Sequence, residues 1–436
     1  MSRRPKRPPE TVDIVDLTHD GRGVARTDGK TLFVDGALPG ETVEAVRLRK
    51  RKTHDEGKVL NLLVSAAERV EPACPWFQIC GGCSLQHLDG SAQLAAKEKV
   101  LLDNLLRIGG VEPRKIYPPI HGPALGYRRR ARLGVRWVEG KGRALVGFRE
   151  RFSSFIADIE YCPVLAPPAD DLIQPLSRLV SGLSLKKRLP QIEVSIGDNR
   201  TALVFRILED PTDRDLDSLR QFRIAHGVDV YLQRGGVDTI AALDGVAAPL
   251  VYHLPEFGLE YRFLPTDFIQ INAAINRQMV SRVTELLGLE PAWRVLDLFS
   301  GLGNFSLPMA RRAASVTAVE GDESLVARAR ENAGLNGIDS AEFHVANLFE
   351  ECRDLPWAAG PYDAVLLDPP RSGARQILPV VDGARRIAYV SCHPGTLARD
   401  AGILVGDYGY RLEGAGVIDM FPNTAHVESM ALFIRD

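Results

Sequence analysis

From about residue 256 onward, the sequence alternates short apolar runs with helical stretches, and this alternation limits the possible folds more than any other feature. Segments such as Asp322–Asn336 are expected to be helices that separate the runs. Such alternation is typical of a parallel sheet covered by helices on both faces. We therefore predict an α/β, doubly wound domain over residues 256–436. The expected strands are Arg294–Phe299, Ser315–Glu320, Ala341–Val345, Ala364–Asp368 and Arg386–Ser391.

Two further regions precede this domain. Residues 1–68 contain short β-branched runs divided by turns such as Leu38-Pro-Gly40, and this pattern predicts a small OB-like barrel. Residues 69–255 are expected to form a central β-rich domain that begins with a cysteine-rich loop. A helix near residues 91–110 in this region is expected to pack on the doubly wound domain.

The composition is that of an ordinary soluble protein, with 45% apolar and 25% charged residues. No apolar run approaches the roughly 20 residues that cross a bilayer. The basic start is followed by acids instead of an apolar segment, which argues against a secretory signal. We expect a cytoplasmic monomer with no membrane partner. The net charge of −2 excludes a polycation, yet Arg47–Lys52 and Arg128–Arg132 are basic runs that could contact phosphates.

A glycine turn follows the first predicted strand of the doubly wound domain. Gly301 and Gly303 allow the backbone to approach a ligand closely. Ser306 stands where a dinucleotide site needs a third Gly or Ala, which counts against NAD. Glu320 and Asp368 end the second and fourth strands, where such sheets bind ligands. Together these features favour S-adenosylmethionine over a dinucleotide.

Cys392 follows the predicted strand Arg386–Ser391 and precedes Pro394, so it lies at the ligand edge of the sheet. A lone cysteine is often an inert buried thiol, and that alternative stays open on this evidence. A catalytic role would be covalent: a thiolate that adds to C6 of uracil makes C5 nucleophilic, so C5 can accept a methyl group. A base must then remove the C5 proton, and Glu428 and His426 are both candidates.

Four other cysteines have metal-ligand spacing. Cys74, Cys80 and Cys83 lie within ten residues, and Cys162 follows at a distance. Four thiolates suit an iron–sulfur cluster or zinc, and the uneven spacing favours the cluster. Disulfides are not expected in a cytosolic chain of this size. The sixth cysteine, Cys352, is expected to be a buried thiol.

The doubly wound region resembles the TrmA/RumA-type RNA uridine-5 methyltransferases, and most of all the branch that acts on 23S ribosomal RNA. The resemblance covers nearly all of this region, in the family's order. It rests on the stretches DFIQIN (267–272), VLDLFSGLGNF (295–305), AVEG (318–321), LLDPPRSGA (366–374), YVSCHP (389–394) and DMFPNTAHVESM (419–430).

The resemblance implies a role for each matching residue. Cys392 would be the nucleophile, and Glu428 would be the proton acceptor. It also implies an N-terminal TRAM domain and a [4Fe-4S] cluster on the four cysteines named above, with 23S ribosomal RNA as the partner and transfer or another RNA as the alternative substrate. Cytosine-5 enzymes carry a cysteine in the fourth-strand motif, which is absent here. His393 departs from the family, which usually has Asn after the nucleophile. The implied S-adenosylmethionine contacts are Gln270, Phe299, Asn304, Glu320, Asn347 and Asp368.

Overall fold

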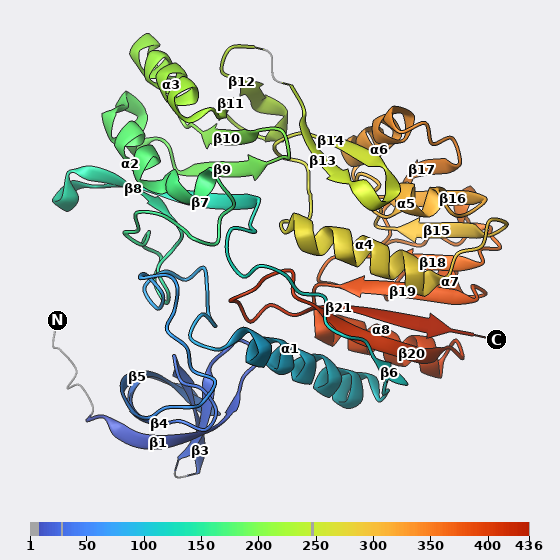
Figure 1. Cartoon of the computed structure of the whole chain (residues 1–436), viewed down its shortest axis with the longest axis horizontal. Helices are drawn as coiled ribbons and strands as arrows, with labels where there is room; N and C mark the ends of the chain where they lie inside the picture. The colour runs from blue at the N-terminus through green and yellow to red at the C-terminus, as the bar shows by residue number, and fades with distance from the viewer. Residues whose placement is uncertain (1–7, 28, 246–247, 436) are drawn as a thin grey trace. The chain divides into compact units, whose positions relative to one another are not determined.

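The computed structural model describes residues 8–27, 29–245 and 248–435, and the chain forms two compact units (Figure 1). The first unit comprises residues 1–100, 149–155 and 421–426. The second comprises residues 101–148, 156–420 and 427–436. Residues 1–7 of the predicted N-terminal domain lie outside the described residues.

A closed five-stranded barrel belongs to the first unit, so the predicted N-terminal barrel is confirmed. Its strands pair in the order β1-β2-β3-β5-β4, and β1 also pairs with β4 to close the barrel. Alternate residues such as Val12 and Ile14 point inward, because successive side chains of a strand face opposite sides. The strands are β1 (Glu10–Leu17), β2 (Gly23–Thr27), β3 (Lys30–Asp35), β4 (Thr42–Lys50) and β5 (His54–Val64).

The second unit contains an eight-stranded sheet in the order β17-β16-β15-β18-β19-β21-β20-β6. The strands from β17 to β19 are parallel, whereas β21 runs antiparallel between β19 and β20. The chain order reverses beside β15, as doubly wound sheets require, and the predicted fold class is confirmed. The strands are β15 (Arg294–Leu298), β16 (Ser315–Glu320), β17 (Ala341–Val345), β18 (Ala364–Leu367), β19 (Arg386–Ser391), β20 (Arg411–Ile418), β21 (Glu428–Ile434) and β6 (Lys115–Ile116).

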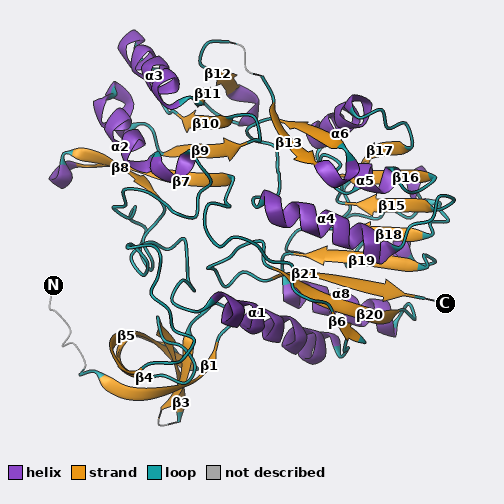
Figure 2. Cartoon of the chain, in the orientation of Figure 1, coloured by secondary structure: helices purple, strands orange, loops and turns teal. Residues whose placement is uncertain are grey.

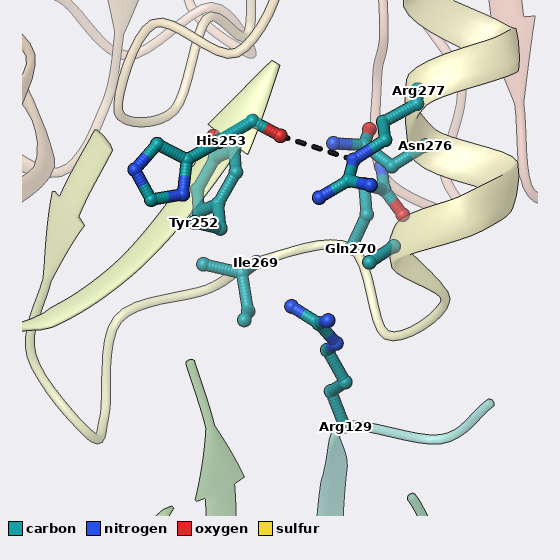
Figure 3. A pocket seen from close by; sticks show the side chains of 8 residues that line it. Arg129, Tyr252, His253, Ile269, Gln270, Asn276 and Arg277 are labelled. Atoms are coloured by element: carbon teal, nitrogen blue, oxygen red, sulfur yellow. Dashed lines mark hydrogen bonds between the residues drawn. The ribbon is translucent and has the colours of Figure 1, made fainter. Parts of the chain in front are cut away.

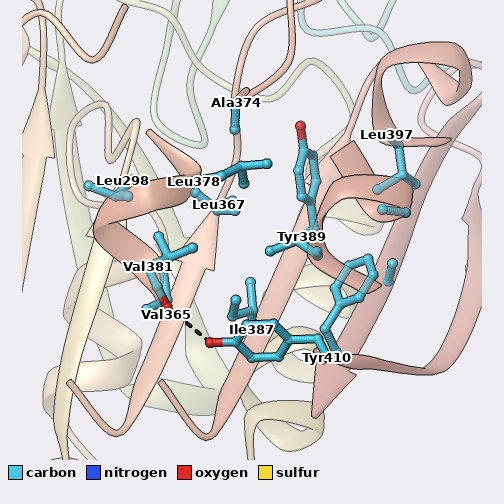
Figure 4. Close-up of a cluster of buried hydrophobic side chains, with 14 of the residues drawn as sticks. Leu298, Val365, Leu367, Ala374, Leu378, Val381, Ile387, Tyr389, Leu397 and Tyr410 are labelled. Atoms are coloured by element: carbon cyan, nitrogen blue, oxygen red, sulfur yellow. Dashed lines mark hydrogen bonds between the residues drawn. The ribbon is translucent and has the colours of Figure 1, made fainter. Parts of the chain in front are cut away.

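Helices cover both faces of this sheet (Figure 2). On one face, side chains from α7, α8 and the segment around Leu101 and Leu105 pack with the strands into one apolar cluster (Figure 4). The Tyr410 hydroxyl in this cluster donates to the Val381 carbonyl at 3.0 Å, so the only polar atom of the Tyr410 side chain has a hydrogen-bond partner. The helices of the domain are α4 (Ala273–Leu287), α5 (Ser306–Ala310), α6 (Glu323–Leu335), α7 (Leu378–Val381) and α8 (Pro394–Gly406), and α1 (Gly90–Asn104) precedes them.

A second sheet of the same unit has the order β12-β11-β10-β9-β7-β8, and a separate hairpin, β13-β14, leads into the doubly wound domain. No helix in the described ranges is long and apolar enough to cross a bilayer. The elements are β7 (Arg130–Val138), β8 (Arg143–Gly147), α2 (Ile173–Gly182), β9 (Gln191–Ile196), β10 (Thr201–Arg206), α3 (Asp213–His226), β11 (Asp229–Gln233), β12 (Ile240–Ala242), β13 (Leu250–Leu254) and β14 (Leu259–Phe263).

Candidate active site

Most of the predicted site residues meet at the carboxyl edge of the large sheet. Glu320 is the last residue of β16, and Phe299, Asp368 and Cys392 directly follow β15, β18 and β19. Asn347 lies two residues beyond β17. Because β15 to β19 are parallel and adjacent, these positions share the edge where doubly wound sheets bind their ligands.

The glycine turn after β15 is tied to the end of β16. Phe299 adopts a φ of +66°, and its N–H donates to the Val319 carbonyl at 2.9 Å. The Gly301 N–H donates to the Glu320 carboxylate at 3.0 Å, which fixes one Glu320 oxygen against the turn. A Cβ at Gly301 would meet no atom within 4 Å, but its φ of +56° favours glycine.

Three carboxylates, those of Asp297, Glu320 and Asp368, gather behind this turn, and the pKa values of Asp297 and Asp368 are raised. Burial, with a smaller contribution from the Glu320 charge, raises the pKa of Asp368 to about 7. Burial also raises the pKa of Asp297 to about 7, although the Ser306 hydroxyl donates to one of its oxygens. The other Asp297 oxygen is buried and has no hydrogen-bond partner among the described residues. Such a group of acids favours a positively charged ligand.

Two aromatic rings lie beside the edge. The Phe299 and Phe349 ring centroids are 5.7 Å apart, and Phe349 is 41% exposed. Asn347 holds this segment, because its Oδ1 accepts the Phe349 N–H at 3.1 Å. An exposed ring next to Glu320 and the glycine turn suits stacking on a flat heterocycle.

Asn304 and Gln270 lie on the side of the turn that faces α4. The Asn304 amide exchanges two hydrogen bonds with Asn276, at 3.0 and 2.9 Å, and accepts one from the Tyr252 hydroxyl at 3.0 Å. Gln270 lies just before α4 and lines a cavity together with Tyr252 and Asn276 (Figure 3). The Asn304 side chain is therefore anchored in the protein, and the residues that anchor it also line this cavity.

The pairing of β19 with β21 brings Cys392 and Glu428 together. Ser391 is opposite Ser429 in this antiparallel pair, so the next residue of one strand faces the preceding residue of the other. Glu428 is 8% exposed. Burial raises the pKa of the Cys392 thiol to about 11, with contributions from the Glu428 and Asp368 charges, while Arg371 opposes the rise.

His393 begins helix α8. Its Nδ1 accepts the Thr396 N–H at 3.3 Å, which makes His393 the N-cap of the helix. Asn is among the best N-caps because its side-chain oxygen accepts the same kind of bond. His393 therefore caps the helix, as the Asn that is usual in the family would. Its Nδ1 is occupied by the hydrogen bond from the Thr396 N–H.

The loop that carries Arg371 is fastened to α8. Asp400 is fully buried and accepts the Ala374 N–H and the Tyr389 hydroxyl, both at 2.7 Å. Arg399 donates to the Ser372 carbonyl at 2.9 Å. These bonds hold the loop after β18 against α8.

Sequence reasoning assigned no role to several residues of this site. Arg371 was visible as the residue after the two prolines, but its effect on Cys392 depends on the fold. Phe349, Asn276 and Tyr252 carry no local sequence signal, because their partners come from distant segments.

The predicted metal ligands lie in different units. Cys74, Cys80 and Cys83 belong to the first unit, and Cys162 belongs to the second. The Phe77 N–H donates to the Cys74 carbonyl at 3.0 Å, and the Gly82 N–H donates to the Cys80 sulfur at an N···S distance of 3.4 Å. No three His, Cys, Asp or Glu side chains of the described residues are arranged around a single metal ion. Cys352 is buried, as expected, and its thiol donates to the Asn347 carbonyl.

Comparison with known families decides the membership of the chain. The model of the tRNA (uracil-5-)-methyltransferase family matches residues 90–436, and the TRAM domain model matches residues 10–50. The chain belongs to the tRNA (uracil-5-)-methyltransferase family. The predicted family, the methyltransferase activity and the TRAM domain are confirmed.

Full-length relatives of this family support the same conclusion. Proteins named 23S rRNA (uracil(1939)-C(5))-methyltransferase RlmD from Methylococcus capsulatus and Thiobacillus denitrificans are 53% and 54% identical to the chain. The alignments cover 100% and 97% of this chain and 100% and 99% of the relatives. The crystal structure of a Pyrococcus abyssi tRNA (uracil-54, C5)-methyltransferase with S-adenosyl-L-homocysteine superposes with a TM-score of 0.74. It is 25% identical and covers 98% of this chain and 100% of its own. The S-adenosylmethionine-dependent methyltransferase fold is thereby confirmed.

Proposed function

We propose that this protein transfers the methyl group of S-adenosylmethionine to C5 of a uridine in 23S ribosomal RNA. The observation that carries the proposal is the proximity of Cys392 and Glu428 at the ligand edge, in a chain about half identical to RlmD proteins over its full length. The relatives' names specify uracil 1939, and we propose the corresponding uridine as the target. The enzyme would act in the cytoplasm as a monomer.

The residues of the glycine turn and strand edge fit the cofactor. Phe299 and Phe349 would flank the adenine, Glu320 would accept hydrogen bonds from the ribose, and Asp368 would face the adenosine. Gln270, Asn304 and Asn347 complete the proposed contacts. The raised pKa of Asp368 supports this assignment, because a cationic sulfonium relieves the repulsion among the acids. When bound, the cofactor supplies the methyl group.

Two residues would carry the covalent chemistry. The Cys392 sulfur adds to C6 of uracil, and the electron pair of the C5–C6 double bond moves to make C5 nucleophilic. After C5 has accepted the methyl group, Glu428 removes the remaining C5 proton. The C6–sulfur bond then breaks, the double bond re-forms and the thiolate leaves. The N-terminus of α8 and Arg371 favour the thiolate, in opposition to the two carboxylates.

The four cysteines would hold a [4Fe-4S] cluster with a structural or RNA-positioning role. The Gly82 N–H that donates to the Cys80 sulfur supports this assignment, because hydrogen bonds to the sulfurs stabilise bound thiolates. Anaerobic purification should give a brown protein that contains iron and sulfide. A colourless protein with one zinc ion per chain would contradict the proposal.

Mapping of 5-methyluridine in ribosomal and transfer RNA, with and without the gene, tests the substrate. We expect 5-methyluridine to be lost at one position of 23S RNA. Transfer RNA is the second candidate, because the Pyrococcus abyssi enzyme of similar fold is named for uracil 54 of tRNA. Loss from transfer RNA alone would replace the ribosomal assignment.

A further inference from the structure

The cavity before α4 is lined by two arginines and a histidine from separate segments. Arg129 comes from the residues before β7, His253 from β13 and Arg277 from the first turns of α4 (Figure 3). The space between these side chains is about 300 Å³, a value that includes the part open to solvent. Arg277 is 38% exposed at its side chain and His253 is 45% exposed, so both can reach a ligand.

One carboxylate organises these cations. Asp198 accepts hydrogen bonds from the guanidinium of Arg129, from His253 Nδ1 at 2.9 Å and from Arg277 at 3.5 Å. Burial raises the pKa of Asp198, but the bonds from His253 and Arg129 outweigh it and keep the pKa below its usual range. Arg277 also donates to the His253 carbonyl at 3.2 Å. Two guanidinium groups share the Asp198 carboxylate. The Glu260 carboxylate lies 3.7 Å from His253 Nε2, but it also pairs with Arg262, so the cluster keeps a net positive charge.

The other two arginines of the Arg128–Arg130 run serve a different purpose. The Arg130 guanidinium donates to the carbonyls of Asp267 and Thr266, which fixes the segment leading to α4. Arg128 donates from its Nε to the Arg130 carbonyl at 2.9 Å. Arg129 is therefore the member of the run that the fold delivers to the cavity.

We infer that Arg129, Arg277 and His253 form a binding site for a backbone phosphate of the substrate RNA, next to the methylated uridine. This inference rests on the proposed function. Guanidinium groups match the geometry of phosphate oxygens and position nucleic acids through the backbone. Tyr252 and Asn276 line the cavity and also hold Asn304 of the glycine turn, so they separate the phosphate site from the cofactor turn by one layer of side chains.

Steady-state methylation of a 23S RNA fragment tests the site. Arg129→Gln and Arg277→Gln should each raise the KM for RNA about tenfold, the size of one charge-assisted hydrogen bond. The slope of log KM against log salt should fall by about 0.7 for each phosphate that the variant no longer neutralises. Arg277→Lys should bind RNA more tightly than Arg277→Gln but less tightly than the wild type, because lysine keeps the positive charge but cannot donate two parallel hydrogen bonds to a phosphate. The matched control is Arg214→Gln, which changes an exposed arginine of α3 that does not line the cavity.

The affinity for S-adenosylhomocysteine, measured by calorimetry, distinguishes the two anions that such a site could bind. Unchanged cofactor affinity with a raised KM for RNA supports the phosphate site. Weakened cofactor affinity with an unchanged salt slope would mean that the arginines bind the cofactor carboxylate, and it would overturn the inference. Wild-type KM and slope in both variants would overturn it as well. If the wild-type protein methylates a different RNA, the proposed substrate fails, and the same variants are tested on that RNA.

Discussion

Replacement of Glu428 by Gln removes the carboxylate beside Cys392 with almost no change in side-chain volume. Burial and the charges of Glu428 and Asp368 raise the pKa of the Cys392 thiol to about 11. A thiol with this pKa is ionised in roughly one molecule in 3000 at pH 7.5. The loss of one nearby negative charge should lower the pKa by about one, which increases the thiolate fraction roughly tenfold.

The same substitution removes the proposed base for the C5 proton. General bases contribute about 10²- to 10⁴-fold to such a step. The two effects act on different steps: Glu428→Gln should form the covalent adduct faster than the wild type near neutral pH, yet it should release the product far more slowly. The methylated RNA should therefore accumulate while still bonded to Cys392.

A time course with radiolabelled cofactor and a 23S RNA fragment measures both steps, because the adduct survives denaturing gel electrophoresis. Runs between about pH 6.5 and 8.5 report the thiolate fraction. Cys392→Ala should form no adduct, and Glu413→Gln on β20 should turn over normally, since Glu413 pairs with Lys115 instead. Product release by Glu428→Gln at the wild-type rate would refute the reasoning and turn attention to His426 as the base.

Three further predictions concern stability. Because the pKa of Asp368 is about 7 in the folded protein and about 3.9 in an unfolded chain, the ligand-free protein should lose stability as the pH rises from about 4 to about 7. Asp368→Asn should have a smaller drop in Tm between about pH 5 and about pH 8, and an unchanged drop would contradict the assigned pKa. His393→Ala removes the cap and should lower the free energy of unfolding, measured by chemical denaturation, by about 1 kcal/mol, whereas His393→Asn should keep both the cap and the activity. Equal losses in the two variants would mean that the imidazole has another role. Tyr389→Phe should lower the free energy of unfolding by about 1–2 kcal/mol, because it removes a buried hydroxyl that donates to Asp400. Tyr408→Phe, at a half-exposed tyrosine, is its control, and equal unfolding free energies for the two variants would exclude a contribution from this bond.

Much of the fold could be predicted, because local patterns determine it. The predicted strand Arg294–Phe299 ends one residue later than β15, and the predicted helix Asp322–Asn336 exceeds α6 by one residue at each end. Apolar runs, glycine turns and the cap at Asp322 are local signals, so they predict the same strands and helices whatever the tertiary packing. The strand-end positions of Glu320, Asp368 and Cys392 follow from the same signals.

The electrostatic roles were not predictable, because they depend on pairings between distant segments. Arg47 belongs to a basic run, yet it forms ion pairs with Glu10 and Asp55 inside the barrel unit, so it differs from its exposed neighbours. The adjacent Arg129 and Arg130 differ in the same way, since one lines a cavity and the other binds backbone carbonyls. A count of charges along the sequence cannot separate these cases.

The high pKa of Cys392 has a consequence for an enzyme that binds a methyl donor. A thiolate held permanently next to an electrophilic sulfonium would itself be methylated, since the thiolate is the reactive form of cysteine. Burial together with the charges of Glu428 and Asp368 raises the pKa of the thiol, so the thiol stays protonated near neutral pH. Arg371 and the N-terminus of α8 act in the opposite direction, so the balance can shift when a bound base changes the solvation of the site. Under the proposed mechanism, the acids that slow thiolate formation would also protect the nucleophile from the cofactor.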